Sequence, residues 1–428
     1  MQAAPPEALV STLANGVRVL CLPMPHLQTA CVSVFVRSGS AHEDRAENGI
    51  SHFVEHMVFK GTAQRDARRI NVDAERLGAE VNAHTDKDHT AFHMRGLARD
   101  APAFVRMLGE IVLQPSFPAH ELEQERQVLL HECAEDEDDG LSIAFERFDR
   151  ACFGAHPAAW PVIGTRRQIE RLTREQLVAY VQRQYSGANI VVGVAGAVDA
   201  EAIQREVEAV FGAVARGAPN TLAPAPYSGD IVAHRQAAEL QAHLVMGFAI
   251  PPAAAEDAAC SLAATLFGEG MSSPLVQRVR EQLGLAYHVS CAADVFDVCG
   301  QFVIEASTAP GQVMELLSEV MSLLVAQAGH VDADELARAR NQIMVRRLRA
   351  HERPARRLED AALDLLLLGR VRSLQALRDG TDAVSASDVR AVFERLLASG
   401  VSVSLAGALP RAASTRAREI IARRGRSG

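Results

Sequence analysis

The sequence contains no long apolar run and no recognisable export signal. Its longest apolar stretch worth testing, Ile190 to Val198, is far shorter than the roughly 20 residues that a bilayer-spanning helix needs, so we expect no membrane-spanning segment and no membrane partner. Residues 1–10 lack both a basic start and an apolar core, which argues against a secretory signal. A cytoplasmic location is the expectation that follows.

Lysine and paired cysteines are also scarce. Lysine occurs only at positions 60 and 87 and the formal net charge is −9, so we expect no broad basic face for nucleic acid. The seven cysteines are scattered without a CxxC pair, which favours reduced thiols over disulfides and argues against a cysteine-ligated zinc site. What remains is the composition of an ordinary globular protein of two or three domains, at roughly 150 residues each.

The chain divides near its middle into two similar halves. Residues 217–229 hold three prolines, a composition that resists helix and sheet and is typical of a linker. On either side, residues 172–198 align with residues 384–409, and each copy has the pattern of an amphipathic helix, a turn and a buried strand. We therefore expect an N-terminal domain over 1–216 and a homologous C-terminal domain over 230–428.

A second match extends the repeat and indicates the fold class. Residues 121–132 align with residues 335–346 at nearly the same offset. Strand-like runs such as 31–36 and 244–250 alternate with long helical patterns in both halves, which favours sheets covered by helices. The sequence predicts an α+β protein made of two related domains.

An HxxEH pattern is formed by His52, Glu55 and His56. Side chains four positions apart lie one turn above each other on a helix, so both imidazoles can reach a single ion, with Glu55 close to the same face. We expect Asn48 to cap this helix and Gly61 to end it. The pattern alone leaves open a plain alternative, two solvent-facing histidines on an ordinary helix.

A catalytic zinc ion typically takes three protein ligands and a water, whose pKa falls to about 7 and whose proton a nearby carboxylate can accept. Glu55 suits that task, and the third ligand has to come from elsewhere. Glu125 and Glu132 are seven positions apart, hence on one helical face, whereas the acidic run 135–139 is typical of a solvated surface. The repeat places alanine and arginine at the matching positions of the second half, so only the first half has kept the carboxylates.

Residues 48–62, taken with residues 125–132, resemble the inverted-motif zinc peptidases of the M16 family, which includes pitrilysin, insulin-degrading enzyme and the mitochondrial processing peptidase. The half-length chain looks most like the processing-peptidase and short bacterial branch. The resemblance implies two homologous α/β sandwich domains, each a mainly antiparallel sheet packed with helices. It also implies one Zn²⁺ per chain held by His52, His56 and Glu132, with Glu125 supporting the site.

Residues 81–85 match the edge strand on which this family lays an extended peptide, which implies that Asn82 and Ala83 bind substrate by strand addition. His84 stands where relatives commonly have tyrosine. From the pattern alone, His84, His89 and His93 are alternating polar strand positions, and we do not expect them to bind metal.

Residues 268–287 have the pattern of a glycine turn, a helix from about Pro274, a stop at Gly284 and a new strand. The resemblance implies that Arg280 and Tyr287 hold the substrate backbone and stabilise the developing oxyanion. From spacing alone they would be a surface helix residue and a strand residue at a core edge. In relatives of this length two chains face each other, so we expect a homodimer or a heterodimer with a paralogue.

These observations predict a zinc-dependent metalloendopeptidase that hydrolyses peptide bonds of unfolded peptides or precursor segments with a zinc-activated water. The alternative is a non-catalytic or partner-dependent subunit of a peptidase heterodimer, because the family also includes inactive partners.

Overall fold

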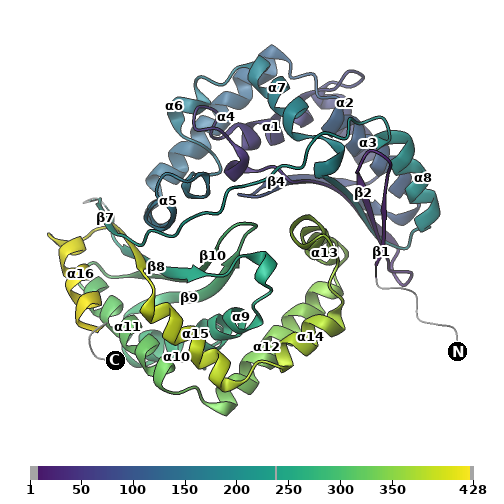
Figure 1. Cartoon of the computed structure of the whole chain (residues 1–428). Helices are drawn as coiled ribbons and strands as arrows, with labels where there is room; N and C mark the ends of the chain where they lie inside the picture. Colours follow the sequence, from purple (N-terminus) through teal and green to yellow (C-terminus); the bar gives the residue numbers. More distant parts are fainter. Residues whose placement is uncertain (1–7, 237–238, 425–428) are drawn as a thin grey trace, which may run out of the picture. The chain divides into compact units, whose positions relative to one another are not determined.

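The computed structural model describes residues 8–236 and 239–424, which form two compact units (Figure 1). The described residues of unit 1 come from 8–133, 161–222 and 348–373. Those of unit 2 come from 134–160, 223–347 and 374–424. Each unit is a mixed sheet covered by helices, which confirms the predicted fold class.

Unit 1 contains a six-stranded sheet in the order β1-β2-β6-β3-β5-β4. Neighbouring strands are antiparallel except for the parallel pair β2 and β6, so the sheet is mainly antiparallel, as predicted. β4 is the last strand in this order and therefore lies at an edge. The strands are β1 (Leu9–Thr12), β2 (Arg18–Pro23), β3 (Thr29–Val36), β4 (Glu80–Thr85), β5 (Thr90–Leu97) and β6 (Ile190–Gly196).

Helices cover both faces of this sheet. Because strand side chains alternate between faces, Val34 and Val192 pack into a core shared with α1, α3, α7 and α8, whereas Phe35 and Val191 pack against α13. The helices with residues in unit 1 are α1 (Ile50–Met57), α2 (Ala67–Arg76), α3 (Ala101–Leu113), α4 (Ala119–Asp138), α6 (Arg166–Ile169), α7 (Arg174–Gln184), α8 (Ala200–Phe211) and α13 (Pro354–Leu368).

Unit 2 repeats this architecture with a five-stranded sheet in the order β7-β11-β8-β10-β9. Its pairs are antiparallel except for the parallel pair β7 and β11. One face packs against α9, α11 and α15, and the other against α5. The strands are β7 (Ile231–Arg235), β8 (Ala242–Ile250), β9 (Ala286–Val295), β10 (Gly300–Thr308) and β11 (Val401–Gly407). The helices are α5 (Gly140–Phe153), α9 (Ala258–Gly268), α10 (Pro274–Val276), α11 (Val313–Gly329), α12 (Ala333–His351), α14 (Leu374–Asp382), α15 (Ala386–Ala398) and α16 (Ala413–Arg424).

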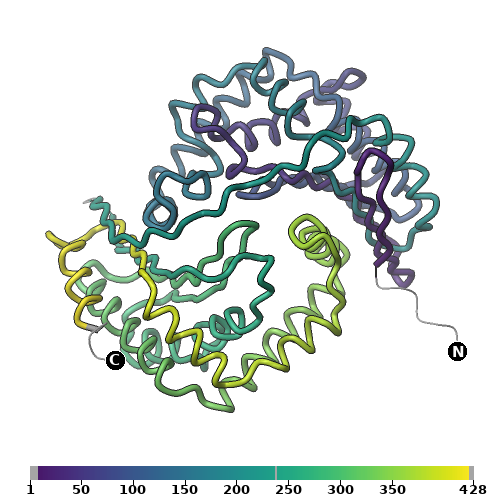
Figure 2. Tube along the Cα trace, in the orientation of Figure 1, coloured from purple at the N-terminus to yellow at the C-terminus, as the bar shows by residue number. Residues whose placement is uncertain are grey.

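The two units exchange one helix relative to the predicted boundaries of 1–216 and 230–428. α5 comes from the first half of the sequence but packs on the unit 2 sheet, where Phe148 contacts the core around Val245. α13 comes from the second half but packs on the unit 1 sheet, and Figure 2 traces the chain through both crossings. Each sheet is apolar on both faces and needs a cover on each, and in both units the exchanged helix supplies one of these covers.

The predicted helix, turn and strand repeat is present in both units. α7 and α15 each begin with a capping box, at Thr173 and Ser385 respectively, and lead into β6 and β11. Both strands end at a glycine with positive φ, 147° at Gly196 and 98° at Gly407.

Among the described residues, no helix combines the length and apolar character required to cross a membrane.

Candidate metal centre

Three predicted ligands converge in unit 1. His52 and His56 lie one turn apart on α1 with ring centroids 4.7 Å apart, and Glu132 approaches from α4. One ligand atom from each residue lies within 4.8 Å of the other two. His56 Nε2 is 3.9 Å from Glu132 Oε2. Two imidazoles and a carboxylate are a ligand set that zinc favours, so the residues fit the predicted ion.

The start of α1 is fixed by a buried carboxylate that sequence reasoning missed. Asn48 does not cap the helix; the N-cap is Gly49 at φ 94°, which has no side chain to offer. Instead Glu43 accepts hydrogen bonds from the backbone N–H of Gly49 and of Ser51, each at 2.8 Å, and from Asn48 Nδ2 at 2.9 Å. Complete burial raises the pKa of Glu43 to about 7, although these hydrogen bonds oppose the rise.

Further contacts hold α1 against the core. The hydroxyl of Tyr180 on α7 hydrogen-bonds with Ser51 at 2.6 Å and with Ser38 at 2.7 Å, and all three side chains are buried. Phe53 and Met57 on the same helix are fully buried. α1 is therefore anchored on its core side, and the histidine side chains project from a rigid support.

Glu125 orients His56 from behind. Its Oε2 lies 2.9 Å from His56 Nδ1, and its Oε1 lies 2.5 Å from Lys60 Nζ. Burial would raise the pKa of Glu125, but the hydrogen bonds from His56 and Lys60 outweigh it and lower the pKa. An ionised Glu125 favours a proton on Nδ1 of His56, which leaves Nε2 free to face Glu132.

His52 is suited to a metal rather than a proton. Burial, together with the charge of His56, lowers the pKa of His52 to about 4, so the ring is neutral near pH 7. Its Nδ1 atom is buried and has no hydrogen-bond partner among the described residues. A neutral buried imidazole with unmet bonding capacity is what a ligand position provides before the ion binds.

Glu55 is held beside this cluster by the edge strand. Thr85 on β4 donates a hydrogen bond from Oγ1 to Glu55 Oε2 at 2.7 Å. Burial raises the pKa of Glu55, and the nearby Glu132 adds to the rise, while Thr85 and His56 oppose it. A carboxylate whose pKa lies above its usual value is a better proton acceptor in a hydrolytic site. Thr85 was not identified from the sequence, because a threonine at a strand end carries no signal of its partner.

Arg280 and Tyr287 lie together in unit 2. The helix begins at Pro274, continues as a π-helical segment over Gln277–Gln282 and stops before Gly284, as the sequence predicted. The guanidinium of Arg280 stacks over the ring of Tyr287 at 4.8 Å from the centroid, and Tyr287 is 85% exposed. Arg280 is only partly exposed and also lies 3.4 Å from the Glu281 carboxylate, so the tyrosine ring is the more accessible of the two to an external ligand. Their role in substrate binding stays a prediction.

Asn82 and Ala83 lie on β4, as predicted, at the edge of the unit 1 sheet. The side chain of Asn82 is exposed and accepts a hydrogen bond from the backbone N–H of Ala83. The edge position is compatible with strand addition by a peptide.

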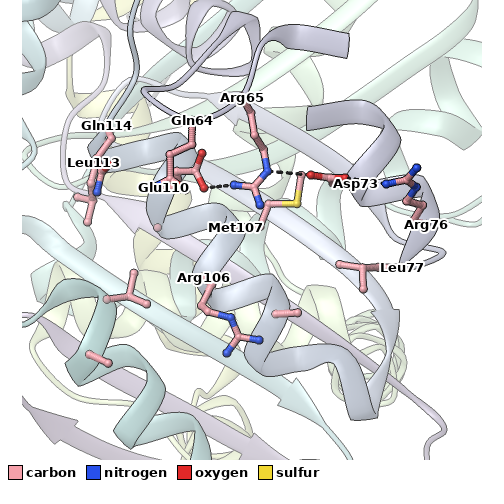
Figure 3. A pocket seen from close by; sticks show the side chains of 14 residues that line it. Gln64, Arg65, Asp73, Arg76, Leu77, Arg106, Met107, Glu110, Leu113 and Gln114 are labelled. Atoms are coloured by element: carbon pink, nitrogen blue, oxygen red, sulfur yellow. Dashed lines mark hydrogen bonds and ion pairs between the residues drawn. The ribbon is translucent and has the colours of Figure 1, made fainter. Parts of the chain in front are cut away.

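A separate hollow of about 610 Å³ in unit 1 has none of the predicted site residues in its lining (Figure 3). Arg65 lies within it and pairs with Asp73 on one side and Glu110 on the other. The two carboxylates thus pair with this guanidinium from both sides.

Two family models match most of the chain. Residues 18–166 match the model described as Insulinase (Peptidase family M16), and residues 171–343 match the model described as Peptidase M16 inactive domain. An uncharacterized zinc protease of Rickettsia bellii is 30% identical over 400 residues, which cover 93% of this chain and 97% of the relative. An uncharacterized zinc protease of Mycobacterium tuberculosis is 32% identical over 408 residues, covering 93% and 92%.

Solved structures share the fold at lower identity. A peptidase M16 inactive domain from Pseudomonas fluorescens superposes with a TM-score of 0.87 at 20% identity, covering 94% of this chain and 98% of that one. A chain of complex III2 from Candida albicans superposes with a TM-score of 0.84 at 19% identity, covering 96% and 99%. From the matched domains and the full-length relatives, the chain belongs to the insulinase family of peptidases, peptidase family M16.

Proposed function

We propose that this protein is a zinc-dependent endopeptidase with one Zn²⁺ per chain held by His52, His56 and Glu132. The observation that carries the proposal is the convergence of these ligand atoms within 4.8 Å beside Glu55. A stand-alone metal-binding protein has no use for a proton-accepting carboxylate at that position. When bound, the ion would polarise the scissile carbonyl and lower the pKa of a water molecule.

The residues of the chain divide the remaining work. Glu55 accepts a proton from the nucleophile and passes it to the leaving amine, while Thr85 fixes the orientation of its carboxylate. Glu125 keeps His56 in the tautomer whose Nε2 faces Glu132. The neutral His52 ring offers a lone pair without first losing a proton near pH 7.

The proposed substrate is an unfolded peptide or precursor segment that adds to the edge of β4. Asn82 and Ala83 would pair with its backbone, so binding requires an extended chain rather than a folded one. Pairing through the backbone does not depend on the side chains of the substrate, which suits a peptidase that cleaves many different unfolded segments.

We further propose that two chains work together, as a homodimer or with a paralogue. The predicted ligands lie in unit 1, whereas Arg280 and Tyr287 lie in unit 2. In a dimer the second chain would supply Arg280 and Tyr287 to hold the substrate backbone and the oxyanion. We also propose a cytoplasmic location, which is supported by the scattered spacing of the seven cysteines in the sequence, without a CxxC pair.

The test is hydrolysis of a peptide library, with cleavage products identified by mass spectrometry. Activity is expected to disappear with a chelator, to return with zinc, and to be lost in Glu55→Gln while that variant still binds one zinc per chain. Thr85→Val should retain zinc and lower kcat, since only the orientation of Glu55 changes. Full activity of Glu55→Gln would refute the proposal.

A partner-dependent subunit is the second candidate. It is supported by the location of Arg280 and Tyr287 outside the unit that carries the ligands. Size measurement in solution, combined with assays of the isolated chain, separates the two. A monomer that binds zinc but cleaves peptides only after a paralogous chain is added would favour this second function.

A further inference from the structure

A second cluster of possible ligands lies in unit 1 on the sheet face that α13 covers. Successive residues of β4 point to opposite faces, so His84 faces away from Thr85 and from the Glu55 carboxylate that Thr85 contacts. His84 on β4, His89 in the β4–β5 turn and Glu359 on α13 each bring one ligand atom within 4.8 Å of the others. We propose that these three residues form a second metal site, for Zn²⁺ or a similar divalent transition metal.

The distances match one ion bound by several residues. His84 Nε2 lies 3.3 Å from His89 Nε2 and 3.7 Å from Glu359 Oε1. Two nitrogens at about 2.0–2.1 Å from a tetrahedral zinc are about 3.3–3.4 Å apart. Zinc is commonly bound by imidazole nitrogen together with carboxylate oxygen. Nickel and cobalt bind the same donors, so the donor set does not select among these three metals. The nitrogen atoms therefore already stand at the separation that coordination requires.

Each proposed imidazole ligand has its other nitrogen engaged. His89 Nδ1 lies 2.8 Å from the carboxylate of Asp88. His84 Nδ1 lies 3.2 Å from Nε2 of His93, whose own Nδ1 lies 2.7 Å from the hydroxyl of Ser33. The Asp88 carboxylate favours a proton on Nδ1 of His89 and leaves its Nε2 lone pair for an ion, while the His93 ring holds His84 through Nδ1 and leaves Nε2 of His84 facing His89. Such outer contacts fix the tautomer of metal-bound histidines.

The Nε2 atoms of His84 and His89 face each other at 3.3 Å. At this distance the Nε2 lone pair of His89 can accept the Nε2 proton of His84, or both nitrogens can bind one metal ion in place of that proton. The carboxylate of Glu359 beside the pair favours a divalent ion over a single proton, because it adds a third donor atom to the same point.

The local charge also favours a cation. The carboxylates that act on these histidines are Asp86, Asp88 and Glu359, and the opposing cation is Arg356. Arg356 pairs with Glu359 through Oε2 at 3.0 Å, which leaves Oε1 as the atom nearest His84. Three carboxylates against one guanidinium leave a net negative environment for a divalent ion.

The three proposed ligands differ in how exposed their side chains are. The side chain of His89 is only 6% exposed, while His84 is 39% exposed and Glu359 23% exposed. An ion can thus reach the site past the more exposed His84 and Glu359 and bind the buried His89. Once bound, it would tie the edge strand β4 to α13, the helix that the second half of the sequence contributes to this unit. We expect this site to stabilise the strand that carries Asn82 and Ala83.

The test uses full-length protein in which His52→Ala and His56→Ala remove the centre proposed above. Cobalt(II) is titrated into this background and its visible absorption is recorded, with metal content checked by elemental analysis. We expect about one cobalt per chain and a higher melting temperature when it binds. Adding Glu359→Gln should weaken cobalt binding by about tenfold or more and reduce that thermal shift.

Asp360→Asn is the matched control, since it removes one carboxylate from the next position of α13 and also pairs with Arg356. It should leave cobalt binding within about twofold of the background. His84→Ala provides a second ligand variant on the exposed side of the cluster, where misfolding is of least concern. No bound cobalt in the background protein, or equal weakening by Glu359→Gln and Asp360→Asn, would overturn the second site. Neither outcome bears on peptide hydrolysis by the unmodified chain.

Discussion

The contact between Glu125 and His56 gives the sharpest test of how the proposed centre is built. In Glu125→Gln the side chain keeps its shape but loses its charge and one acceptor oxygen. At present Oε2 engages His56 Nδ1 at 2.9 Å and Oε1 engages Lys60 Nζ at 2.5 Å. The single amide oxygen of glutamine cannot accept hydrogen bonds from both His56 and Lys60. The amide nitrogen is itself a donor and would face the donor group of one of them.

The expected loss in zinc affinity is about 10–100-fold, the usual effect of removing an outer hydrogen-bond partner from a metal-bound histidine. This corresponds to about 1.4–2.8 kcal/mol. The upper end is expected, because Glu125 is only 9% exposed and solvent cannot replace the lost carboxylate. The zinc affinity is measured by competition with a chromogenic chelator. The protein used also carries Glu359→Gln, so that only zinc bound at His52, His56 and Glu132 contributes to the measured affinity.

The matched control is Glu123→Gln on the same helix. Glu123 is 66% exposed and pairs with Arg126, so the variant makes the same chemical change at a carboxylate whose partner is an arginine and not a histidine. It should bind zinc as the parent does. Equal zinc affinities for Glu125→Gln, Glu123→Gln and the parent would refute the assignment of Glu125 as the support of His56.

Three further predictions concern stability and substrate binding. Glu43 has a folded pKa of about 7 against 4.5 for the free side chain, so its contribution to stability is fully present below about pH 4.5 and is lost as pH rises through 7, by about 3 kcal/mol in total. Denaturant unfolding of zinc-free protein at pH 5 and pH 8 should show this loss, and Glu43→Gln should reduce it; an unchanged difference would contradict the prediction. Gly196→Ala and Gly407→Ala should each cost about 2 kcal/mol or more, because a Cβ would meet the backbone oxygen of Thr29 or Gln241, whereas Gly78→Ala, with φ 61° and open space around it, should cost about 1 kcal/mol. Comparable losses at all three glycines would contradict the steric reasoning. Arg280→Lys keeps the charge but loses planar stacking on Tyr287, so kcat/KM for peptides should fall about tenfold or more at unchanged zinc content; unchanged kcat/KM would remove Arg280 from the proposed substrate contacts.

Local patterns carried much of the prediction. The HxxEH spacing, the stop before Gly284 and the repeated helix, turn and strand all depend on residues close together in sequence, and the structure contains each of them. The approach of Glu132 came instead from the resemblance to a family. Spacing alone indicates a shared helical face but does not say which other helix that face meets.

The features that sequence reasoning missed depend on distant partners. No sequence pattern pointed to Glu43, yet its carboxylate accepts hydrogen bonds at the start of α1, where Asn48 was expected to be the cap. His84 and His89 were interpreted as ordinary polar strand positions, because Glu359 lies far along the chain and reaches them only through the exchange of α13. Residues 84–89 (HTDKDH), in β4 and the turn that follows it, were the available signal in the sequence. Spacing within this segment does not indicate that it contacts α13, a helix from the second half of the sequence.

Comparison of the two units indicates that the fold and the proposed metal centre are separable. α9 holds the place of α1 in the element order of unit 2, and it is apolar, with Leu266 and Phe267 fully buried. On α12, Ala339 fills a buried position that corresponds to Glu125, and Arg346 pairs with Glu269 where Glu132 would be a ligand. Unit 2 thus builds a similar sheet and helices with side chains at these two positions that are not metal ligands. The histidines and carboxylates of unit 1 are accordingly not required to form this architecture, and a buried Glu125 without His56 and Lys60 would only destabilise it. Their presence in one unit alone is the pattern expected if they serve chemistry.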